Sequence, residues 1–309
     1  MNILITGANG FIGRNLKEYF KKQKTHKIYA PTEIDLDLTN SNAVEDFFLI
    51  NEINCIIHSA TVLHINKEYA SNVCEQNLKM FFNLYKYKTK ETKLINLGSG
   101  SEYSRDNWMS QMNESYFDKY IPQDSHSFSK YVMSKFIESS DDSSLLHLRI
   151  FGIFGKYEDY RYKFISNCIA KNLMNLPIII NQNVCYDYIF VDDFSKIVEK
   201  LISNYPKIKV LNVTPNKSTD LLSINNIVQK LLNRKNEVKI LNAGYGKEYT
   251  GDNSNLRKYL GNFKFTPIEK SIAELLSYYS KNIHLFDKGE LLNDQFLEYA
   301  KIIFDGKIK

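Results

Sequence analysis

Residues 2–13, NILITGANGFIG, determine how the chain begins to fold. The apolar run at 2–6 predicts a buried strand, and from residue 11 onward apolar side chains recur at helical spacing. Between these two patterns lie Gly7, Gly10 and Gly13. Glycines at such points permit a tight turn, let the backbone approach a pyrophosphate and allow close helix packing, while the helix N-terminus favours negative charge. The stretch therefore predicts a strand, a phosphate-binding turn and a helix.

The same alternation of strands and helices continues beyond this stretch. Further strands are expected within 27–30, 54–60, 93–99 and 144–155, with helices between them. Such alternation predicts a parallel sheet covered on both faces, here an α/β fold with a Rossmann-type doubly wound sheet. We expect residues 1–155 to form a dinucleotide-binding domain to which 187–205 return. Residues 156–309 should be mainly a smaller C-terminal α/β region that binds substrate.

Composition excludes several classes of protein. The 309 residues are 43% hydrophobic and 24% charged, the net charge is +5, and no apolar run is long enough for a membrane span. The lysines are scattered, so neither nucleic acid nor membrane is expected as a partner. The four cysteines lack the spacing of a metal site or a disulfide framework. Because MNILITG leads directly into a strand, a secretory signal is not expected, and we expect a cytoplasmic protein without a metal.

The stretch KYVMSK at 130–135 carries the first candidate for catalysis. It contains nothing that breaks a helix, so Tyr131 and Lys135 should lie one helical turn apart on the same face. A phenol normally has a pKa of about 10, too high for efficient proton exchange near neutrality. A lysine one turn away would lower the pKa of Tyr131. The pair therefore predicts a general acid or base.

A serine at the end of a strand completes this chemistry. LGSGSEYS closes the strand expected at 93–99 and offers Ser99, whose hydroxyl could polarise a substrate carbonyl. A tyrosine and a lysine at this spacing arise often by chance, but here they follow a glycine turn and a strand-end serine in the order that such a site needs. Together Ser99, Tyr131 and Lys135 predict a catalytic triad.

The end of the second strand bears on the choice of cofactor. In a dinucleotide-binding fold, an acid usually holds the ribose of NAD there. That place falls near Pro31, with Thr32 beside it and Glu33 slightly beyond. Without an acid at the place itself, a 2′-phosphate would not be repelled, and Arg14 or a nearby lysine could attract it. We therefore expect NADPH, with NADH possible because of Glu33.

These motifs together resemble the extended short-chain dehydrogenase/reductase family, which comprises NAD(P)-dependent nucleotide-sugar epimerases, dehydratases and reductases. The resemblance covers nearly the whole chain and rests on TGANGFIG at 6–13, Asp37 and Leu38, HSAT at 58–61, Asn77, Ser99, YVMSK at 131–135, LRIFGIFG at 148–155 and DYIFVDD at 187–193. It implies that cofactor-binding residues are Gly7, Asn9, Gly10, Phe11, Ile12, Gly13, Arg14, Asp37, Leu38, Ser59, Ala60, Thr61, Asn77 and Lys135. Lys135 would hold the nicotinamide ribose.

Departures from the family patterns narrow the reaction. Sugar 4,6-dehydratases of the family carry Asp and Glu directly after the catalytic Ser or Thr, whereas Gly100 and Ser101 follow Ser99. The stretch EIDLDLTNSNAVEDFF is similar to the GDP-fucose synthases, which epimerise C3 and C5 before they reduce C4. Their epimerisation uses a cysteine where this chain has Ser101, and a histidine that would fall near Lys163 or Phe164. The residues for reduction are present and those for epimerisation are not.

The resemblance and its departures predict an oxidoreductase of deoxysugar biosynthesis. It would transfer hydride from NADPH to C4 of a nucleotide-linked 4-keto-6-deoxy sugar without C3/C5 epimerisation. The alternatives are a 4-epimerase with tightly bound NAD and, less expected, a non-catalytic dinucleotide-binding regulator, which would not need the triad. Family members are commonly dimers, so a homodimer is expected. Substrate-binding candidates are Ser101, Arg161, Lys163, Tyr186 and Arg257.

Overall fold

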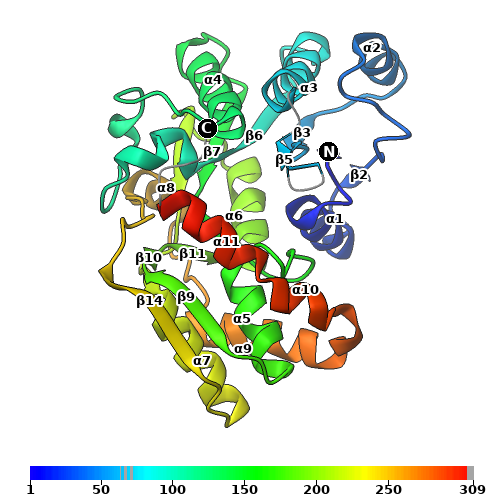
Figure 1. The fold of residues 1–309 in the computed structure, drawn as a ribbon. Coiled ribbons are helices and arrows are strands. Elements are labelled where there is room, and N and C mark those ends of the chain that lie inside the picture. Colours follow the sequence, from blue (N-terminus) through cyan, green and yellow to red (C-terminus); the bar gives the residue numbers. More distant parts are fainter. Residues whose placement is uncertain (63, 66–67, 70–71, 305–309) are drawn as a thin grey trace.

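In the computed structural model of the protein, a six-stranded parallel sheet forms the centre of the larger part of the molecule (Figure 1). The structure describes residues 1–304 except 63, 66, 67, 70 and 71. The strand order is β12-β7-β6-β3-β1-β2. The bounds are β1 Asn2–Thr6, β2 Lys27–Tyr29, β3 Cys55–His58, β6 Lys93–Ser99, β7 Leu145–Ile150 and β12 Val210–Val213. This sheet confirms the predicted Rossmann-type α/β fold.

Helices cover both faces of the sheet. One face packs on α1 (Phe11–Gln23) and α6 (Val191–Ser203), and the other on α2 (Ser41–Ile50), α3 (Val73–Tyr87) and α4 (Ser125–Ser139). Successive residues of a strand point to opposite faces. Accordingly Ile3 and Ile5 join the core with α1 and α6, whereas Leu4 joins the core with α3 and α4. Burial on both faces explains why the strands are continuous apolar runs.

The order of the strands places a ligand crevice beside β1. The chain passes from β1 to β2 on one side and then to β3 on the other. In open parallel sheets, ligands bind outside the carboxyl ends of the strands where the order reverses in this way. Gly7 follows β1 and Ser59 follows β3, so the predicted phosphate turn and the second predicted cofactor segment meet at this crevice.

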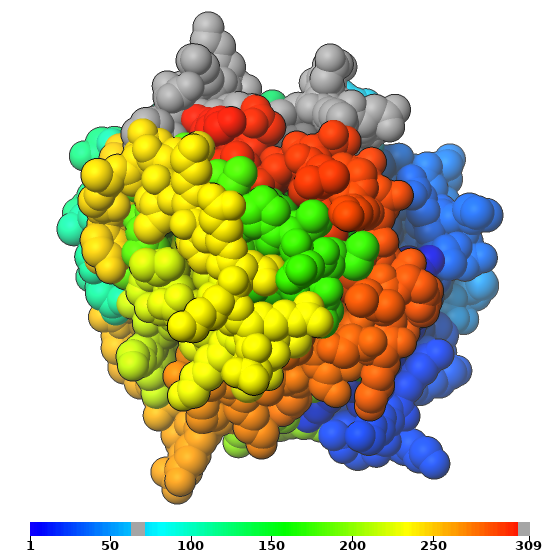
Figure 2. Space-filling view, turned by 60° about the horizontal axis from the view of Figure 1, so that its bottom comes forward, coloured from blue at the N-terminus to red at the C-terminus, as the bar shows by residue number. Residues whose placement is uncertain are grey.

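The C-terminal part has its own core. There β9 (Ile178–Asn183) pairs with β14 (Val238–Tyr245), and α5 (Phe164–Leu173), α7 (Leu221–Leu232) and α9 (Ile268–Lys281) pack with them. Figure 2 shows its green, yellow, orange and red segments lying against one another on one face. Further elements include the strands β4 His64–Ile65, β5 Glu68–Tyr69, β8 Gly152–Phe154, β10 Cys185–Tyr186, β11 Tyr188–Phe190 and β13 Thr219–Asp220, the helices α10 Lys288–Asn293 and α11 Gln295–Phe304, and the 3-10 turns η3 Glu114–Tyr116 and η4 Ile283–Leu285.

Several segments of the second half return to the central sheet. Besides α6, these are β12, which pairs with β7, and α8 (Ser254–Leu260), which packs on α6 and β12. The return therefore extends beyond the expected stretch 187–205. Among the residues described, no helix combines the length and the apolar character that crossing a membrane requires.

Candidate active site

The predicted catalytic residues come from two neighbouring elements. Ser99 ends β6, and Tyr131 and Lys135 lie one turn apart on α4, which packs against β6. The Asp124 carboxylate fixes the start of α4 by accepting the Ser127 N–H at 2.9 Å, as an N-cap does. Tyr131 is buried in an aromatic cluster with Phe117, Phe151 and other side chains, while Lys135 is half exposed.

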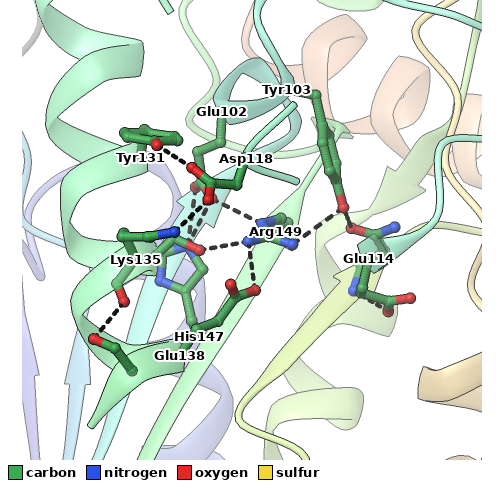
Figure 3. Close-up of polar contacts among 12 residues, drawn as sticks. Glu102, Tyr103, Glu114, Asp118, Tyr131, Lys135, Glu138, His147 and Arg149 are labelled. Carbon is green, nitrogen blue, oxygen red and sulfur yellow. Dashed lines mark hydrogen bonds and ion pairs between the residues drawn. The ribbon is translucent and has the colours of Figure 1, made fainter. Parts of the chain in front are cut away.

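An acid that the sequence did not reveal joins the tyrosine and the lysine. The Tyr131 hydroxyl donates to one carboxylate oxygen of Asp118, and the Lys135 ammonium donates to the other (Figure 3). Asp118 has a φ of 70°, in the left-handed region where Asp is among the few side chains that are tolerated. Its carboxylate thus faces α4 from the irregular segment between β6 and α4.

This contact reverses the predicted titration of Tyr131. The hydrogen bond to Asp118, together with partial burial, raises the pKa of Tyr131 to about 12. The sequence predicted a lower pKa because Lys135 lies one turn away, and that prediction was wrong. The ammonium is paired with Asp118 instead, and Lys135 and Tyr131 in turn lower the pKa of the Asp118 carboxyl. As arranged here, Tyr131 is a proton donor rather than a phenolate.

Ser99 is held by the 3-10 turn that follows it, η1 (Gly100–Tyr103). Its Oγ accepts the Ser101 N–H at 3.1 Å, and its own N–H donates to Glu102 Oε1 at 2.7 Å. The turn has the form of a capping box, in which the Ser99 side chain accepts a backbone N–H of the turn and the Glu102 side chain accepts the N–H of Ser99. The Tyr249 hydroxyl lies 3.3 Å from Ser99 Oγ on another side. The turn therefore fixes the backbone of Ser99 as well as its side chain.

A buried network of charged and polar side chains connects this turn to β7. Glu102, His147 and Arg149 are completely buried, and both basic side chains lie 2.9 Å from the Glu102 carboxylate (Figure 3). Burial alone would raise the pKa of Glu102, but His147 and Arg149 outweigh it and hold this pKa below the ordinary value. Sequence reasoning missed the network, although an arginine inside the apolar stretch LRIFGIFG was a visible signal.

The same network reaches the helix of the tyrosine and lysine. Arg149 donates to Ser134 Oγ at 2.6 Å and to Glu138 at 3.0 Å, both on α4. Its guanidinium also lies 4.0 Å from the centre of the ring of Phe117, the residue that precedes Asp118 in the sequence. One buried arginine therefore ties η1, α4 and the segment of Asp118 together.

The glycine turn after β1 is shaped to receive a phosphate. Gly7 has a φ of 64°, and a Cβ on Gly13 would lie 2.3 Å from the Gly7 carbonyl oxygen, so neither position admits a side chain. The Gly10 N–H donates to that carbonyl at 3.0 Å, which closes the turn. A Cβ on Gly10 would meet no atom closer than 3.3 Å, so the absence of a side chain at Gly10 leaves room for a ligand on the outer side of the turn. A dinucleotide pyrophosphate fits this cradle at the start of α1.

The other residues of this turn extend the same surface. Asn9 is exposed, and Phe11 and Ile12 are partly exposed at the start of the helix. Arg14 follows, but its guanidinium lies 3.6 Å from the centre of the Tyr157 ring and 3.5 Å from Glu18. Its contacts are therefore with α1 and with the segment after β8.

The segment after β3 is fastened in position by polar contacts. Ser59 Oγ donates to the Thr6 carbonyl at 2.6 Å, and the Ala60 N–H donates to Thr6 Oγ1 at 3.2 Å. Asn77, buried on α3, accepts a hydrogen bond from the Val62 N–H at 2.8 Å and one from Thr61 Oγ1 at 3.3 Å. Its amide also donates to Ser129 Oγ on α4 at 3.3 Å. The predicted cofactor residues 59–61 and 77 therefore form one connected wall.

The turn after β2 carries an acid that the sequence analysis did not weigh. Asp35 accepts the Thr32 N–H at 2.9 Å and its hydroxyl at 2.8 Å, while Glu33 is exposed. Asp37 likewise accepts both donors of Thr39, and Leu38 is buried in the core with α3 and α4. The carboxylates of Asp35 and Asp37 are thus engaged with their own turns.

The predicted substrate residues fall into two groups. Ser101 is buried, and its hydroxyl makes no hydrogen bond within the described part of the chain. Tyr186 stacks on Tyr188 and touches the Tyr249 ring edge to face at 5.9 Å. Because Tyr249 reaches Ser99, both Ser101 and Tyr186 lie beside the candidate catalytic serine.

The three basic candidates lie farther along the chain and are engaged differently. Arg161 pairs with Asp159 at 2.7 Å and lines a tyrosine-rich pocket of about 390 Å³. Lys163 directly precedes α5. Arg257, on α8, donates to the Phe263 carbonyl at 3.0 Å, at the core shared with α1 and α6. The structure therefore does not gather these three with Ser99.

Comparison with known proteins gives a family match. The family described as "NAD dependent epimerase/dehydratase family" matches residues 3–214. GDP-L-colitose synthase of Yersinia pseudotuberculosis is 31% identical over 111 residues, which cover 34% of this chain and 36% of that protein. GDP-6-deoxy-D-talose 4-dehydrogenase of Aggregatibacter actinomycetemcomitans is 22% identical over 305 residues, 89% of this chain and 97% of that protein. The match to the first relatives thus spans only about a third of their length.

Solved structures share the fold. A GDP-L-fucose synthetase from Naegleria fowleri superposes with a TM-score of 0.79 at 15% identity, covering 93% of this chain and 95% of that one. A GDP-mannoheptose C4 reductase from Campylobacter jejuni with NADP bound gives 0.75 at 18% identity, covering 90% and 98%. A dTDP-glucose 4,6-dehydratase from Bacillus anthracis in complex with NAD gives 0.75 at 17%, covering 93% and 98%.

Proposed function

Because the chain belongs to the NAD dependent epimerase/dehydratase family, we propose that it is a nucleotide-sugar 4-ketoreductase. It reduces C4 of a nucleotide-linked 4-keto-6-deoxy sugar with NADPH and does not epimerise C3 or C5. The observation that carries the proposal is the asymmetry of the site. Ser99, Tyr131 and Lys135 are all present, whereas Ser101 and the Lys163–Phe164 step stand where an epimerase pair would be needed.

The surroundings of Glu102 support reduction over water elimination. Glu102 is the first acid after Ser99, and a dehydratase needs a free acid and base there. Here its carboxylate is completely buried and bound by His147, Arg149 and the Ser99 N–H. Its position in this network makes it a structural group. We therefore assign no proton transfer to Glu102.

The residues of the chain divide the reductive step among them. The bound dinucleotide supplies the hydride. The glycine turn holds the pyrophosphate and Lys135 the nicotinamide ribose, while Ser99 donates a hydrogen bond to the C4 oxygen. Tyr131 protonates that oxygen as negative charge develops on it. Asp118 suits this direction, because its hydrogen bond keeps Tyr131 protonated until the alkoxide, a much stronger base, appears.

The cofactor and the nucleotide belong to the same proposal. No acid stands at Pro31 or Thr32, and Asp35 is turned toward Thr32, which favours a 2′-phosphate at that point, whereas the exposed Glu33 leaves NADH possible. The Campylobacter jejuni reductase with this fold binds NADP, which agrees with NADPH as the cofactor. The names of the relatives from Yersinia pseudotuberculosis and Aggregatibacter actinomycetemcomitans both refer to GDP-linked sugars. We therefore place GDP first among the candidate nucleotides.

Oligomeric state and location complete the proposal. We propose a homodimer formed through α3 and α4, where Phe128 is 37% exposed at the start of α4. We also propose that the protein works in the cytoplasm. Light scattering during size-exclusion chromatography should give twice the mass of one chain, and Phe128→Asp should reduce it to that of a monomer. A single-chain mass for the unmodified protein would contradict the dimer.

The test of function follows NADPH and NADH absorbance with GDP-, CDP- and dTDP-linked 4-keto-6-deoxy sugars. We expect stoichiometric oxidation of NADPH, with Tyr131→Phe losing on the order of 10²–10⁴ in rate. Tyr116→Phe is the matched control, because its hydroxyl donates to the Asn107 carbonyl instead. No net oxidation, together with NAD retained through purification and interconversion of 4-hydroxy sugars, would instead establish the 4-epimerase. If the protein binds a dinucleotide but catalyses neither reaction, the result would favour a non-catalytic regulator.

A further inference from the structure

Tyr249, far from Ser99 in the sequence, is built rigidly into the site. Its N–H donates to the Cys185 carbonyl at 3.0 Å, and its carbonyl accepts the Asp187 N–H at 3.2 Å. Its ring stacks on Trp108 with 4.1 Å between the ring centroids and 28° between their planes, and it touches Phe151 at 5.0 Å. Only 7% of the residue is exposed. Main chain and ring are thus both fixed, which sets the position of the hydroxyl.

That hydroxyl completes the acceptor contacts of Ser99. A serine hydroxyl has one hydrogen to donate and two lone pairs that accept. The Ser101 N–H occupies one lone pair of Ser99 Oγ at 3.1 Å, and the Tyr249 hydroxyl lies 3.3 Å from the same atom. If Tyr249 donates, both lone pairs are filled. The hydrogen of Ser99 must then point away from both partners, as a donor to a third group.

Two further features allow Tyr249 to act as the donor to Ser99. Burial raises the pKa of Tyr249 well above its ordinary value, so the phenol keeps its proton. Gly100 has no side chain where the phenol passes, since a Cβ there would lie 2.8 Å from the Tyr249 hydroxyl and 2.7 Å from the Phe151 ring. The glycine after Ser99 is therefore what allows Tyr249 to approach.

We propose that Tyr249 is a positioning residue that donates to Ser99 Oγ and thereby directs the serine's own hydrogen toward the carbonyl oxygen of the substrate. The inference rests on the proposed function in one respect, that Ser99 contacts the reacting oxygen. It adds a contribution of the C-terminal part of the chain to the orientation of a residue on the central sheet.

The kinetic test compares the unmodified protein with Tyr249→Phe, Ser99→Ala and the double variant. We expect Tyr249→Phe to lower kcat about fivefold to tenfold with little change in KM, as the loss of one hydrogen bond would. In the Ser99→Ala background the same change should have no further effect, because the group that it positions is gone. Tyr116→Phe, which removes another hydroxyl from this aromatic cluster, should leave kcat unchanged. Equal losses from Tyr249→Phe in both backgrounds would overturn the proposal.

A second measurement does not depend on the reaction. Denaturant unfolding of the four proteins should show coupling, with the double variant less destabilised than the sum of the single variants. Additive losses of stability would mean that the two hydroxyls are not bonded, which overturns the proposal whatever the enzyme does. Coupling without any effect on kcat would overturn the positioning role. Failure of the proposed function shows separately, as an unmodified protein that oxidises NADPH with none of the sugars.

Discussion

Two carboxylates hold the candidate catalytic residues, and their surroundings differ sharply. Glu102 supports Ser99 from a completely buried position among His147 and Arg149. Asp118 joins Tyr131 and Lys135 from a position where its side chain is 42% exposed. A buried charge is costly to leave unpaired, whereas an exposed pair contributes little to stability. The comparison teaches that Glu102 stabilises the fold of the site, whereas Asp118 sets the pKa of Tyr131.

The largest expected effect follows from neutralising the buried acid. Glu102→Gln leaves the buried guanidinium of Arg149 without its closest ionic partner, so we expect a loss of about 3–5 kcal/mol in the free energy of unfolding. Denaturant unfolding followed by circular dichroism measures it. Glu138→Gln is the matched control, because Glu138 pairs with the same arginine but is 35% exposed, and it should cost much less. Equal losses from both variants would break the distinction between buried and exposed partners.

Neutralising the exposed acid should change activity rather than stability. The proposed reduction needs a protonated Tyr131, so its rate should fall as pH rises through the pKa of that residue. The hydrogen bond to Asp118, partial burial and, more weakly, the negative charges of Asp118 and Glu138 raise this pKa to about 12. Asp118→Asn removes the nearer charge and frees Lys135, so the alkaline limb of the profile should move to lower pH. The profile of kcat/KM between about pH 6 and pH 12 measures it.

The control for this experiment is Asp106→Asn, an exposed acid on η2 (Arg105–Asn107) in the same irregular segment. It should leave the limb in place and the unfolding midpoint unchanged. An Asp118→Asn profile that coincides with that of the unmodified protein would show that Asp118 does not govern the proton of Tyr131. The observed pairing would then have no consequence for catalysis.

Lowering the pH should also distinguish Glu102 from Asp118, through a smaller effect on the stability of the protein. The pKa of Glu102 is lowered in the folded state, so the unfolded state binds more protons as pH falls below the ordinary value of about 4.5. The contribution of Glu102 is therefore complete above that pH and is lost as pH falls through its folded-state pKa. Unfolding midpoints from about pH 3 to pH 7 should fall more steeply with acid for the unmodified protein than for Glu102→Gln. Asp118→Asn should retain nearly the steepness of the unmodified protein, and parallel curves for all three would contradict the assignment.

The same comparison explains what the sequence could and could not reveal. The glycine turn and the placement of Tyr131 and Lys135 on one helix depend on spacings of a few residues, so local patterns sufficed to predict them. The family and the fold were predicted correctly from the same motifs. Asp118 sits in an irregular segment, and Tyr249 lies 150 residues from Ser99, so no periodicity points to either. The predicted pKa of Tyr131 was wrong because it considered only the neighbour on the helix.

The smallest expected effect comes from salt, and it tests whether exposure itself is the cause of the difference. Raising ionic strength from 0.1 M to 1 M shortens the screening length from about 10 Å to about 3 Å, which weakens exposed charges and barely affects buried ones. The alkaline limb of the unmodified protein should therefore move to lower pH by roughly a few tenths of a unit, since an exposed pair is worth under about 1 kcal/mol. The limb of Asp118→Asn should not move to lower pH, because the Asp118 charge is absent and salt screens only the freed Lys135 ammonium, which would move the limb to higher pH. The difference in unfolding free energy between the unmodified protein and Glu102→Gln should also stay constant. A limb that ignores salt in both proteins would mean that Tyr131 feels Asp118 through the hydrogen bond alone, because only the charge interaction is screened.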